Sequence, residues 1–272
     1  MTGRLGLIAG GGGLPVAIVE DCAQRGRDVF LIRLKGFADP SLAALPGEDS
    51  GLAEFGRSVK ALKRAGCRSV CLAGIVHHPD FKTLKPDFLA MKHLPRVIAA
   101  AGKGDDALLR AVLGAFEIEG FAVEGSGQAA PGLLLGAGPL GSVSPGPEQT
   151  VDINAALAAA REVGRTDVAQ GAVARDGEVI ACEGRAGTDA MLRSLPAGEG
   201  MRRGVLAKLP KPRQDLRVDL PTIGVGTIEH AAAAGLAGVV GQADGMLVVG
   251  RPAVREAADR LGLFIVGLEP EA

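Results

Sequence analysis

The 272-residue sequence contains no Trp and no Tyr, and eight Phe supply all of its large aromatic rings. Proteins that bind single-stranded nucleic acid stack bases on such rings. The charges are also balanced, with 30 Lys and Arg against 31 Asp and Glu and a net charge of −1. No basic field therefore attracts a polyanion. Together these absences argue against nucleic acid as a partner.

Cysteines are few and long apolar runs are absent. Four cysteines (Cys22, Cys67, Cys71 and Cys182) are too sparse for a disulfide framework, so we expect reduced thiols in the core of a cytoplasmic protein. No apolar run reaches the roughly 18 residues that a membrane-spanning helix needs. The apolar stretch before Gly10 is too short for a signal peptide. Any membrane contact is therefore expected to be peripheral.

The composition, 47% hydrophobic and 22% charged, is that of a globular protein, and the length suggests about two domains. Short aliphatic runs at residues 4–9, 28–34 and 68–73 alternate with amphipathic stretches. This alternation is the pattern of βαβ units. We therefore predict an α/β fold whose N-terminal domain, residues 1–130, is a Rossmann-like parallel sheet with helices on its faces.

A second domain is predicted after a change in composition. Residues 131–150 are rich in Gly and Pro and read as a linker. Residues 151–272 then return to α/β alternation, but Asp176-Gly177 between two apolar runs predicts an antiparallel hairpin. The C-terminal domain is therefore expected to be α/β with a mixed sheet, and it carries most of the candidate catalytic residues.

A glycine run, Gly10 to Gly13, follows the first predicted strand and precedes a helix that begins near Pro15. Backbone N–H groups at such a helix start can bind an anion. The run is not the dinucleotide fingerprint, because Pro15 takes the place of the third glycine and no acidic residue ends the second strand. A nucleotide or phosphate site and a purely structural tight turn both remain open.

Two further places in the N-terminal domain are candidates. His77 follows the third strand, at the edge where open α/β sheets bind ligands, and a phosphate contact or loop packing would each explain it. Three prolines between His77 and Pro95 predict a functional loop with only a short helix. Asp105 and Asp106 begin a helix that runs to Ile118, where they act either on a ligand or as capping charges.

The densest group of polar residues lies in the second domain, on loops stiffened by proline. The cations Lys208 and Lys211 are followed by Asp215, Arg217 and Asp219, after the earlier Asp167, Gln170, Thr188 and Asp189. A diphosphate ester with a divalent metal needs this mixture, because cations neutralise phosphate oxygens while carboxylates hold Mg²⁺ or Mn²⁺ and orient water.

Six segments, in order along nearly the whole chain, resemble the LpxI-type UDP-2,3-diacylglucosamine pyrophosphatases of lipid A biosynthesis. They are Gly6–Pro15, Gly104–Arg110, Asp167–Gln170, Gly187–Met191, Lys208–Lys211 and Gln214–Gly224. The resemblance implies hydrolysis of UDP-2,3-diacylglucosamine to 2,3-diacylglucosamine 1-phosphate and UMP, with a divalent metal, in a two-domain protein at the cytoplasmic face of the inner membrane.

With that resemblance, specific roles can be assigned as hypotheses. Asp219 and Asp189 would bind Mg²⁺ or Mn²⁺ and orient the attacking water, and Lys208 and Lys211 would neutralise the phosphates. The residues expected to bind the substrate are Gly10, Gly11, Gly12, Gly13, His77, Asp105, Asp106, Gln170 and Thr188.

The expected partners are a lipid-linked sugar nucleotide as substrate and the inner-membrane surface, with a homodimer left open as the assembly. Two other functions remain open: a non-catalytic nucleotide-binding or regulatory module, and a sugar-nucleotide transferase. Product analysis separates them, since a hydrolase releases UMP without an acceptor, a transferase needs one, and a regulatory module releases nothing.

Overall fold

The computed structural model describes residues 3–77, 84–102, 104–165, 169–197, 202–211, 217 and 220–270. These residues form two compact units. Unit 1 comprises the described residues up to Gly132 together with Arg217, and unit 2 comprises the others from Leu133 onward. None of the helices in these ranges has the length and hydrophobicity to cross a membrane.

Unit 1 contains a five-stranded sheet in which every pairing is parallel. The strand order is β3-β2-β1-β4-β5, so the chain moves outward from β1 in one direction and then crosses back to its other side. This topology confirms the predicted Rossmann-like sheet. The strands are β1 (Leu5–Ala9), β2 (Val29–Leu34), β3 (Gly47–Ser50), β4 (Ser69–Ala73) and β5 (Ala122–Val123).

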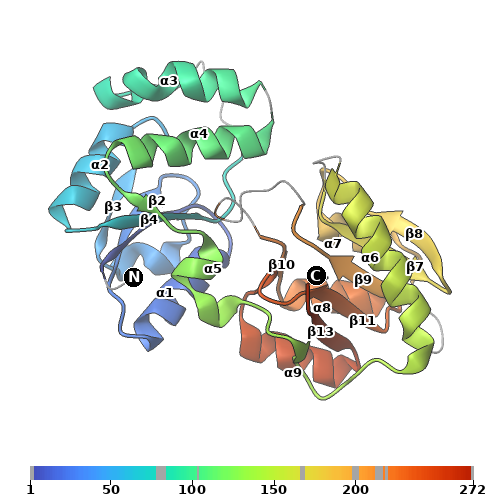
Figure 1. The fold of residues 1–272 in the computed structure, drawn as a ribbon. Coiled ribbons are helices and arrows are strands. Elements are labelled where there is room, and N and C mark those ends of the chain that lie inside the picture. The colour runs from blue at the N-terminus through green and yellow to red at the C-terminus, as the bar shows by residue number, and fades with distance from the viewer. Residues whose placement is uncertain are drawn as a thin grey trace. The chain divides into compact units, whose positions relative to one another are not determined.

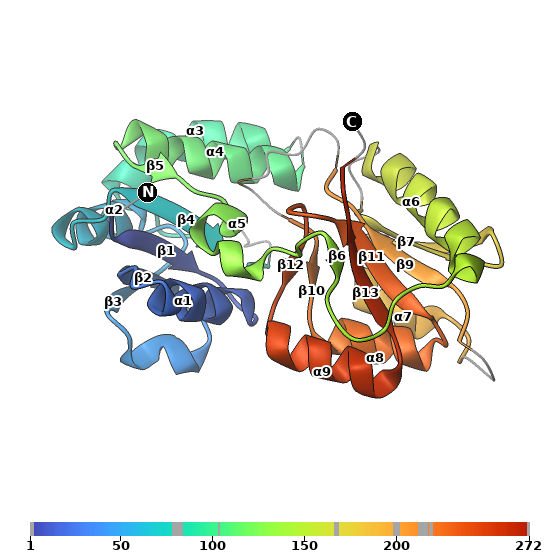
Figure 2. The same ribbon diagram turned by 60° about the horizontal axis from the view of Figure 1, so that its bottom comes forward.

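Helices cover both faces of this sheet. Figures 1 and 2 show α1 (Leu14–Gln24) on one face and α2 (Phe55–Arg64), α3 (Phe88–Ala101) and α4 (Asp105–Ile118) on the other. The core beneath α2 and α4 contains Ile32, Leu62 and Phe116. Shorter elements are the 3-10 helix η1 (Pro40–Ala44) and the helix α5 (Ser126–Ala129).

Helix α3 corrects the prediction of a loop with a short helix before Pro95. The helix begins at Phe88, where Asp87 accepts a hydrogen bond from the N–H of Ala90 at 2.8 Å, and continues through Pro95 to Ala101. Proline removes one helical hydrogen bond, but the helix also packs against α2 and α4. Tertiary packing therefore outweighs the local penalty of the proline.

Unit 2 contains a six-stranded mixed sheet, as predicted for the C-terminal domain. Its order is β6-β13-β11-β9-β7-β8, with parallel pairing of β9, β11 and β13 and antiparallel pairing at both edges. The strands are β6 (Gly138–Pro139), β7 (Gly171–Arg175), β8 (Glu178–Cys182), β9 (Val205–Lys208), β11 (Gly238–Gln242) and β13 (Phe264–Leu268); β10 (Thr222–Ile223) and β12 (Leu247–Val248) form a separate parallel pair.

The two faces of this sheet bury alternate residues of the same strands. Leu206 and Val239 pack in a cluster with the helices α7 (Thr188–Ser194), α8 (Val225–Ala233) and α9 (Arg251–Leu261). Val205 and Val240, next to them in sequence, pack on the other face with α6 (Thr150–Arg165). This period of two is what a strand buried on both faces requires. Figure 2 shows α6 on the opposite face from α8 and α9.

Residues 131–150, predicted to be a linker, contain η2 (Pro131–Leu133), β6, η3 (Pro147–Gln149) and the first residue of α6. Leu135 in this segment lies in the core of unit 2. The predicted hairpin is present as β7 and β8, and Asp176 and Gly177 have φ values of 52° and 80° at its turn. Positive φ at both positions is the backbone conformation of a type I′ turn.

The thiols follow the prediction for three of the four cysteines. Cys22, Cys67 and Cys71 are buried, whereas Cys182 is exposed on β8. Burial raises the pKa of Cys67 to about 11 and that of Cys71 to about 12. These two thiols are therefore neutral packing groups at neutral pH.

Candidate functional site

Among the predicted site residues whose side chains the structure describes, the most buried charge is the ammonium group of Lys208. This lysine ends β9 with only 6% of its surface exposed. Its Nζ donates to Thr188 Oγ1 at 2.6 Å and to the carbonyl oxygen of Thr222 at 3.1 Å. A buried cation is expensive unless it is hydrogen-bonded, and these acceptors fix the direction of the side chain. Lys208 is thus a preoriented cation at the carboxyl end of a parallel strand.

Thr188 connects this cation to a carboxylate. Its hydroxyl accepts from Lys208 and donates to Glu183 Oε1 at 2.8 Å, and Glu183 Oε2 accepts from the backbone N–H of Gln170 at 3.1 Å. The four residues come from four places in the chain: the end of β9, the start of α7, and the two loops that flank the β7–β8 hairpin. We call Gln170, Glu183, Thr188 and Lys208 the lysine network.

Glu183 is the member of the lysine network that the sequence did not reveal. It directly follows β8 and stands among small residues, and a single carboxylate after an exposed strand is ordinarily a solvated charge. The hairpin register, which pairs Ala172 with Cys182, brings Glu183 beside Gln170, and the start of α7 places Thr188 next to it. Its position directly after a predicted strand was the one sequence feature that could have marked Glu183 as a site residue, and many surface residues share that feature.

Asp189, next to Thr188 on α7, points to a different set of groups. Its Oδ1 accepts from Thr227 Oγ1 at 3.3 Å and lies 3.7 Å from Nδ1 of His230. The Asp189 side chain is about half exposed. A carboxylate with an accessible oxygen is a suitable ligand for Mg²⁺. Within the described ranges, however, no three His, Cys, Asp or Glu side chains come together as a metal-binding group.

The other residues predicted for the second domain are only partly placed. Lys211 is half-buried on the loop after β9. Asp219, the principal predicted metal ligand, lies outside the described residues. The structure therefore brings Gln170, Thr188 and Lys208 together, places Asp189 beside His230 and Thr227, and does not test Asp219.

In unit 1 the glycine run lies at the carboxyl edge of the parallel sheet, between β1 and α1. Two of its four N–H groups are already used, because Gly10 donates to the carbonyl of Ala73 and Gly11 to that of Ile75, each at 2.8 Å. No described acceptor pairs with the N–H groups of Gly12 and Gly13. An anion at the start of α1 would therefore be bound by the N–H groups of Gly12 and Gly13.

Gly74, directly after β4, allows the backbone of the glycine run to approach the end of β4 closely. Its φ is +95°, and a Cβ there would lie 2.6 Å from the carbonyl oxygen of Gly11. Any larger residue would push the glycine run away from the end of β4. A tight turn and a ligand site both require this close approach, so the geometry leaves the two interpretations of the glycine run open.

His77 is exposed a few residues beyond β4, with its ring 6.4 Å from that of Phe37. Asp105 and Asp106 begin α4 as predicted, but their side chains lie outside the described part of the structure. The roles predicted for these residues are therefore not tested by their contacts.

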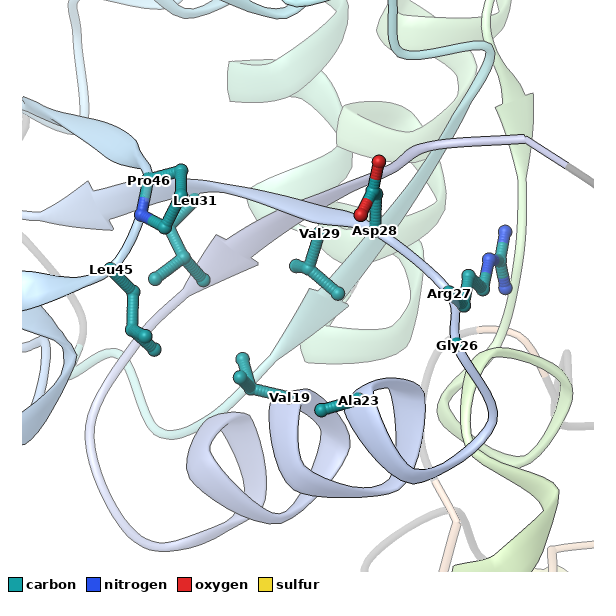
Figure 3. A pocket seen from close by; sticks show the side chains of 9 residues that line it. All are labelled: Val19, Ala23, Gly26, Arg27, Asp28, Val29, Leu31, Leu45 and Pro46. Carbon is teal, nitrogen blue, oxygen red and sulfur yellow. The ribbon is translucent and has the colours of Figure 1, made fainter.

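A hollow of about 290 Å³ lies elsewhere in unit 1, between α1 and the start of β2. Figure 3 shows Val19 and Ala23 of α1 facing Val29, while the Asp28 carboxylate points away. The neighbouring Arg27 is held by Glu124 through two hydrogen bonds of 2.7 and 2.8 Å. The hollow lies at the amino end of β2, is lined mainly by apolar residues, and contains none of the predicted site residues.

Comparison with known proteins identifies the relatives of both units. The model of the LpxI N-terminal domain matches residues 4–133, and that of the LpxI C-terminal domain matches residues 136–266. A protein from Caulobacter vibrioides named UDP-2,3-diacylglucosamine pyrophosphatase LpxI is 55% identical over 275 residues, covering 98% of each chain.

A solved structure of CobK precorrin-6A reductase is also similar, at 16% identity and a TM-score of 0.34, over 100% of this chain and 89% of that one. The two domain models and the Caulobacter relative extend over both units of the chain. The chain belongs to the LpxI family.

Proposed function

We propose that this chain hydrolyses the diphosphate of UDP-2,3-diacylglucosamine, giving 2,3-diacylglucosamine 1-phosphate and UMP, as a step of lipid A biosynthesis. The observation that carries the proposal is the 55% identity, over 98% of both chains, to the Caulobacter vibrioides protein named for this pyrophosphatase activity. The lysine network supports it with a preoriented cation of the kind that diphosphate chemistry needs.

Within this proposal, the chain's own residues bind and orient the diphosphate. Lys208 neutralises a phosphate oxygen from a direction fixed by Thr188 and Thr222, and Lys211 supplies a second cation. Positive groups that are oriented in advance stabilise the charge that develops on the leaving phosphate. Gln170 and Thr188, which lie in the same network as Lys208, bind the substrate.

We further propose that the reaction depends on Mg²⁺ or Mn²⁺ with Asp219 and Asp189 as ligands. The accessible carboxylate of Asp189 suits a hard divalent cation, and Asp219 would supply the further oxygen ligands. When bound, such a metal neutralises phosphate charge and activates water. The reaction is expected in the cytoplasm, at the inner-membrane surface where a diacylated substrate resides.

The test is hydrolysis of UDP-2,3-diacylglucosamine by the wild type and by Asp219→Ala, with EDTA and with added Mg²⁺ or Mn²⁺, while UMP and the lipid phosphate are followed. We expect metal-dependent release by the wild type and a loss of at least about a hundredfold in the variant, roughly 2.7 kcal/mol of transition-state stabilisation. Asp28→Ala, an exposed carboxylate beside the hollow of Figure 3, is the matched control and should remain active.

Other outcomes would redirect the assignment. Full activity of Asp219→Ala would move the metal site toward Asp189 or toward Asp105 and Asp106. Release that requires a sugar acceptor would indicate a transferase. Absence of product under every metal condition would reject the hydrolase and leave a nucleotide-binding module.

A further inference from the structure

One helix of unit 1 presents large apolar side chains to solvent. Phe88, Met91 and Ile98 of α3 are 83%, 51% and 52% exposed, and Pro95 between them is exposed as well. Successive members of this set are three, four and three positions apart, which places them on one face of the helix. We call these four residues the apolar stripe.

The opposite face of α3 is packed, so the orientation of the apolar stripe is fixed. Leu89 packs against the core of unit 1. His93 is buried, with its ring 5.3 Å from that of Phe55 and its Nε2 3.3 Å from Glu119 Oε1. Rotating the helix to bury Phe88 would expose these residues. The apolar stripe is therefore an outward surface of the folded unit.

The charges on this helix have one sign. Its sequence, FLAMKHLPRVIAAA, contains no Asp or Glu. Lys92 and Arg96 are exposed beside the apolar stripe, and Lys85 is exposed just before the helix. The Nζ of Lys92 lies 3.9 Å from Glu119 Oε1 but its side chain is still mostly exposed. The preceding Asp87 is occupied as a helix cap, because it accepts from the N–H groups of Ala90 and Arg57. A basic helix is unexpected in a chain whose net charge is −1.

We propose that α3 docks the protein on the surface of an anionic phospholipid bilayer, with the apolar stripe at the boundary between headgroups and acyl chains. Interfacial helices combine an apolar face with flanking Lys and Arg in this way, and each basic side chain near an anionic surface adds to the attraction. The choice of a lipid occupant rests on the proposed function, because a substrate with two acyl chains is held in a membrane. The docking surface brings the enzyme to that substrate.

The first experiment is co-sedimentation of the full chain with vesicles of phosphatidylethanolamine and phosphatidylglycerol, and with vesicles of phosphatidylcholine alone. The wild type should bind the anionic vesicles more tightly, and added salt should weaken that binding. The variant Phe88→Ser/Met91→Ser/Ile98→Ser should bind at least about tenfold more weakly. The matched control is Val151→Ser/Val179→Ser/Ile180→Ser, which removes exposed apolar side chains from unit 2 and should bind as the wild type does.

A charge variant, Lys92→Gln/Arg96→Gln, tests the same surface without changing an apolar residue. Both side chains are exposed, so folding should be retained even if the serine variant unfolds. Binding to anionic vesicles should fall about tenfold or more, with little change on phosphatidylcholine. Thermal unfolding of each variant checks that the fold is intact.

Four results would overturn the docking proposal. The first is that the wild type binds neither kind of vesicle, and the second is that both α3 variants fold and bind as tightly as the wild type. The third is that the wild type forms a dimer and the serine variant does not. The fourth is that the serine variant loses as much hydrolytic activity on detergent-dispersed substrate as on substrate in vesicles. The third would assign the apolar stripe to a second copy of the chain, and the fourth to the acyl chains of the bound substrate. Vesicle binding needs no catalysis, so an inactive wild type that still binds would reject only the proposed function.

Discussion

Thr188 is the residue whose environment best shows how side-chain chemistry builds this site. A hydroxyl can accept and donate at the same time, and here it accepts from the buried ammonium of Lys208 while donating to Glu183. The result is a cation and a carboxylate held apart by one oxygen atom. Under the proposed function, the shared hydroxyl helps to orient the Lys208 ammonium group toward a substrate phosphate.

Replacing Thr188 tests this arrangement at the scale of one residue. Thr188→Val keeps the shape but removes the hydroxyl, so Lys208 and Glu183 each lose a hydrogen bond inside the protein. We expect kcat/KM to fall by about tenfold to a hundredfold, or roughly 1.4–2.7 kcal/mol. Thr188→Ser restores the hydroxyl and should recover most of the activity. Equal activity of the Val and Ser variants would show that the hydroxyl does not position Lys208.

At the scale of elements, a buried ion pair links the amino end of β2 to the carboxyl end of the short strand β5 in the unit 1 sheet. Arg27 precedes β2, Glu124 follows β5, and their side chains form two hydrogen bonds while only 10% and 2% exposed. The same guanidinium donates to Ser69, the first residue of β4, at 3.1 Å. This pair lies opposite the glycine run, so its role is structural.

Breaking this pair should destabilise the fold strongly. Glu124→Gln leaves the Arg27 charge buried without its counter-charge, and we expect the free energy of unfolding to fall by about 3 kcal/mol or more. The matched control is Glu162→Gln, which breaks the exposed pair with Arg165 on α6 and should change stability by less than about 1 kcal/mol. Urea denaturation of both variants measures the difference, and equal effects would contradict the structural role of the buried pair.

At the scale of the whole molecule, acid should destabilise the protein through its hydrogen-bonded carboxylates. Burial raises the pKa of Glu124, but hydrogen bonds from Arg27 and Ser69 and the Arg27 charge outweigh burial and hold that pKa below its ordinary value. Hydrogen bonds also lower the pKa values of Asp39, Glu54 and Asp259. A carboxyl whose pKa is depressed by folding stabilises the folded state above its unfolded pKa and loses that contribution as the pH falls.

The unfolding free energy should therefore decrease as the pH drops below about 4.3, the ordinary pKa of a glutamate, and continue to decrease toward the folded pKa of Glu124. Denaturant titrations at a series of pH values measure this slope. The slope should be shallower in Glu124→Gln, because that variant has no carboxyl to protonate there. Equal slopes in the wild type and the variant would show that another group dominates acid unfolding.

The elements that the sequence predicted are those specified by local pattern. The strands β1, β2 and β4 are aliphatic runs, which predict strands from the sequence alone. The Asp-Gly pair between β7 and β8 likewise predicts a hairpin turn without knowledge of the fold. Helix α3 was not, because Pro95 argues locally against it. Strand β3, with the sequence GEDS, has no apolar run and becomes a strand by pairing with β2.

By itself, the sequence determined the α/β class, the Rossmann-like and mixed-sheet units, and the LpxI family, because periodicity and ordered motifs are properties of the chain. Only the tertiary structure decided that Glu183 joins Lys208 through Thr188, that Gly10 and Gly11 use their N–H groups internally, and that α3 turns an apolar stripe outward. The physical reason is that such contacts join residues far apart in the chain. Their meeting depends on strand register and helix rotation, which are set by packing of the whole unit.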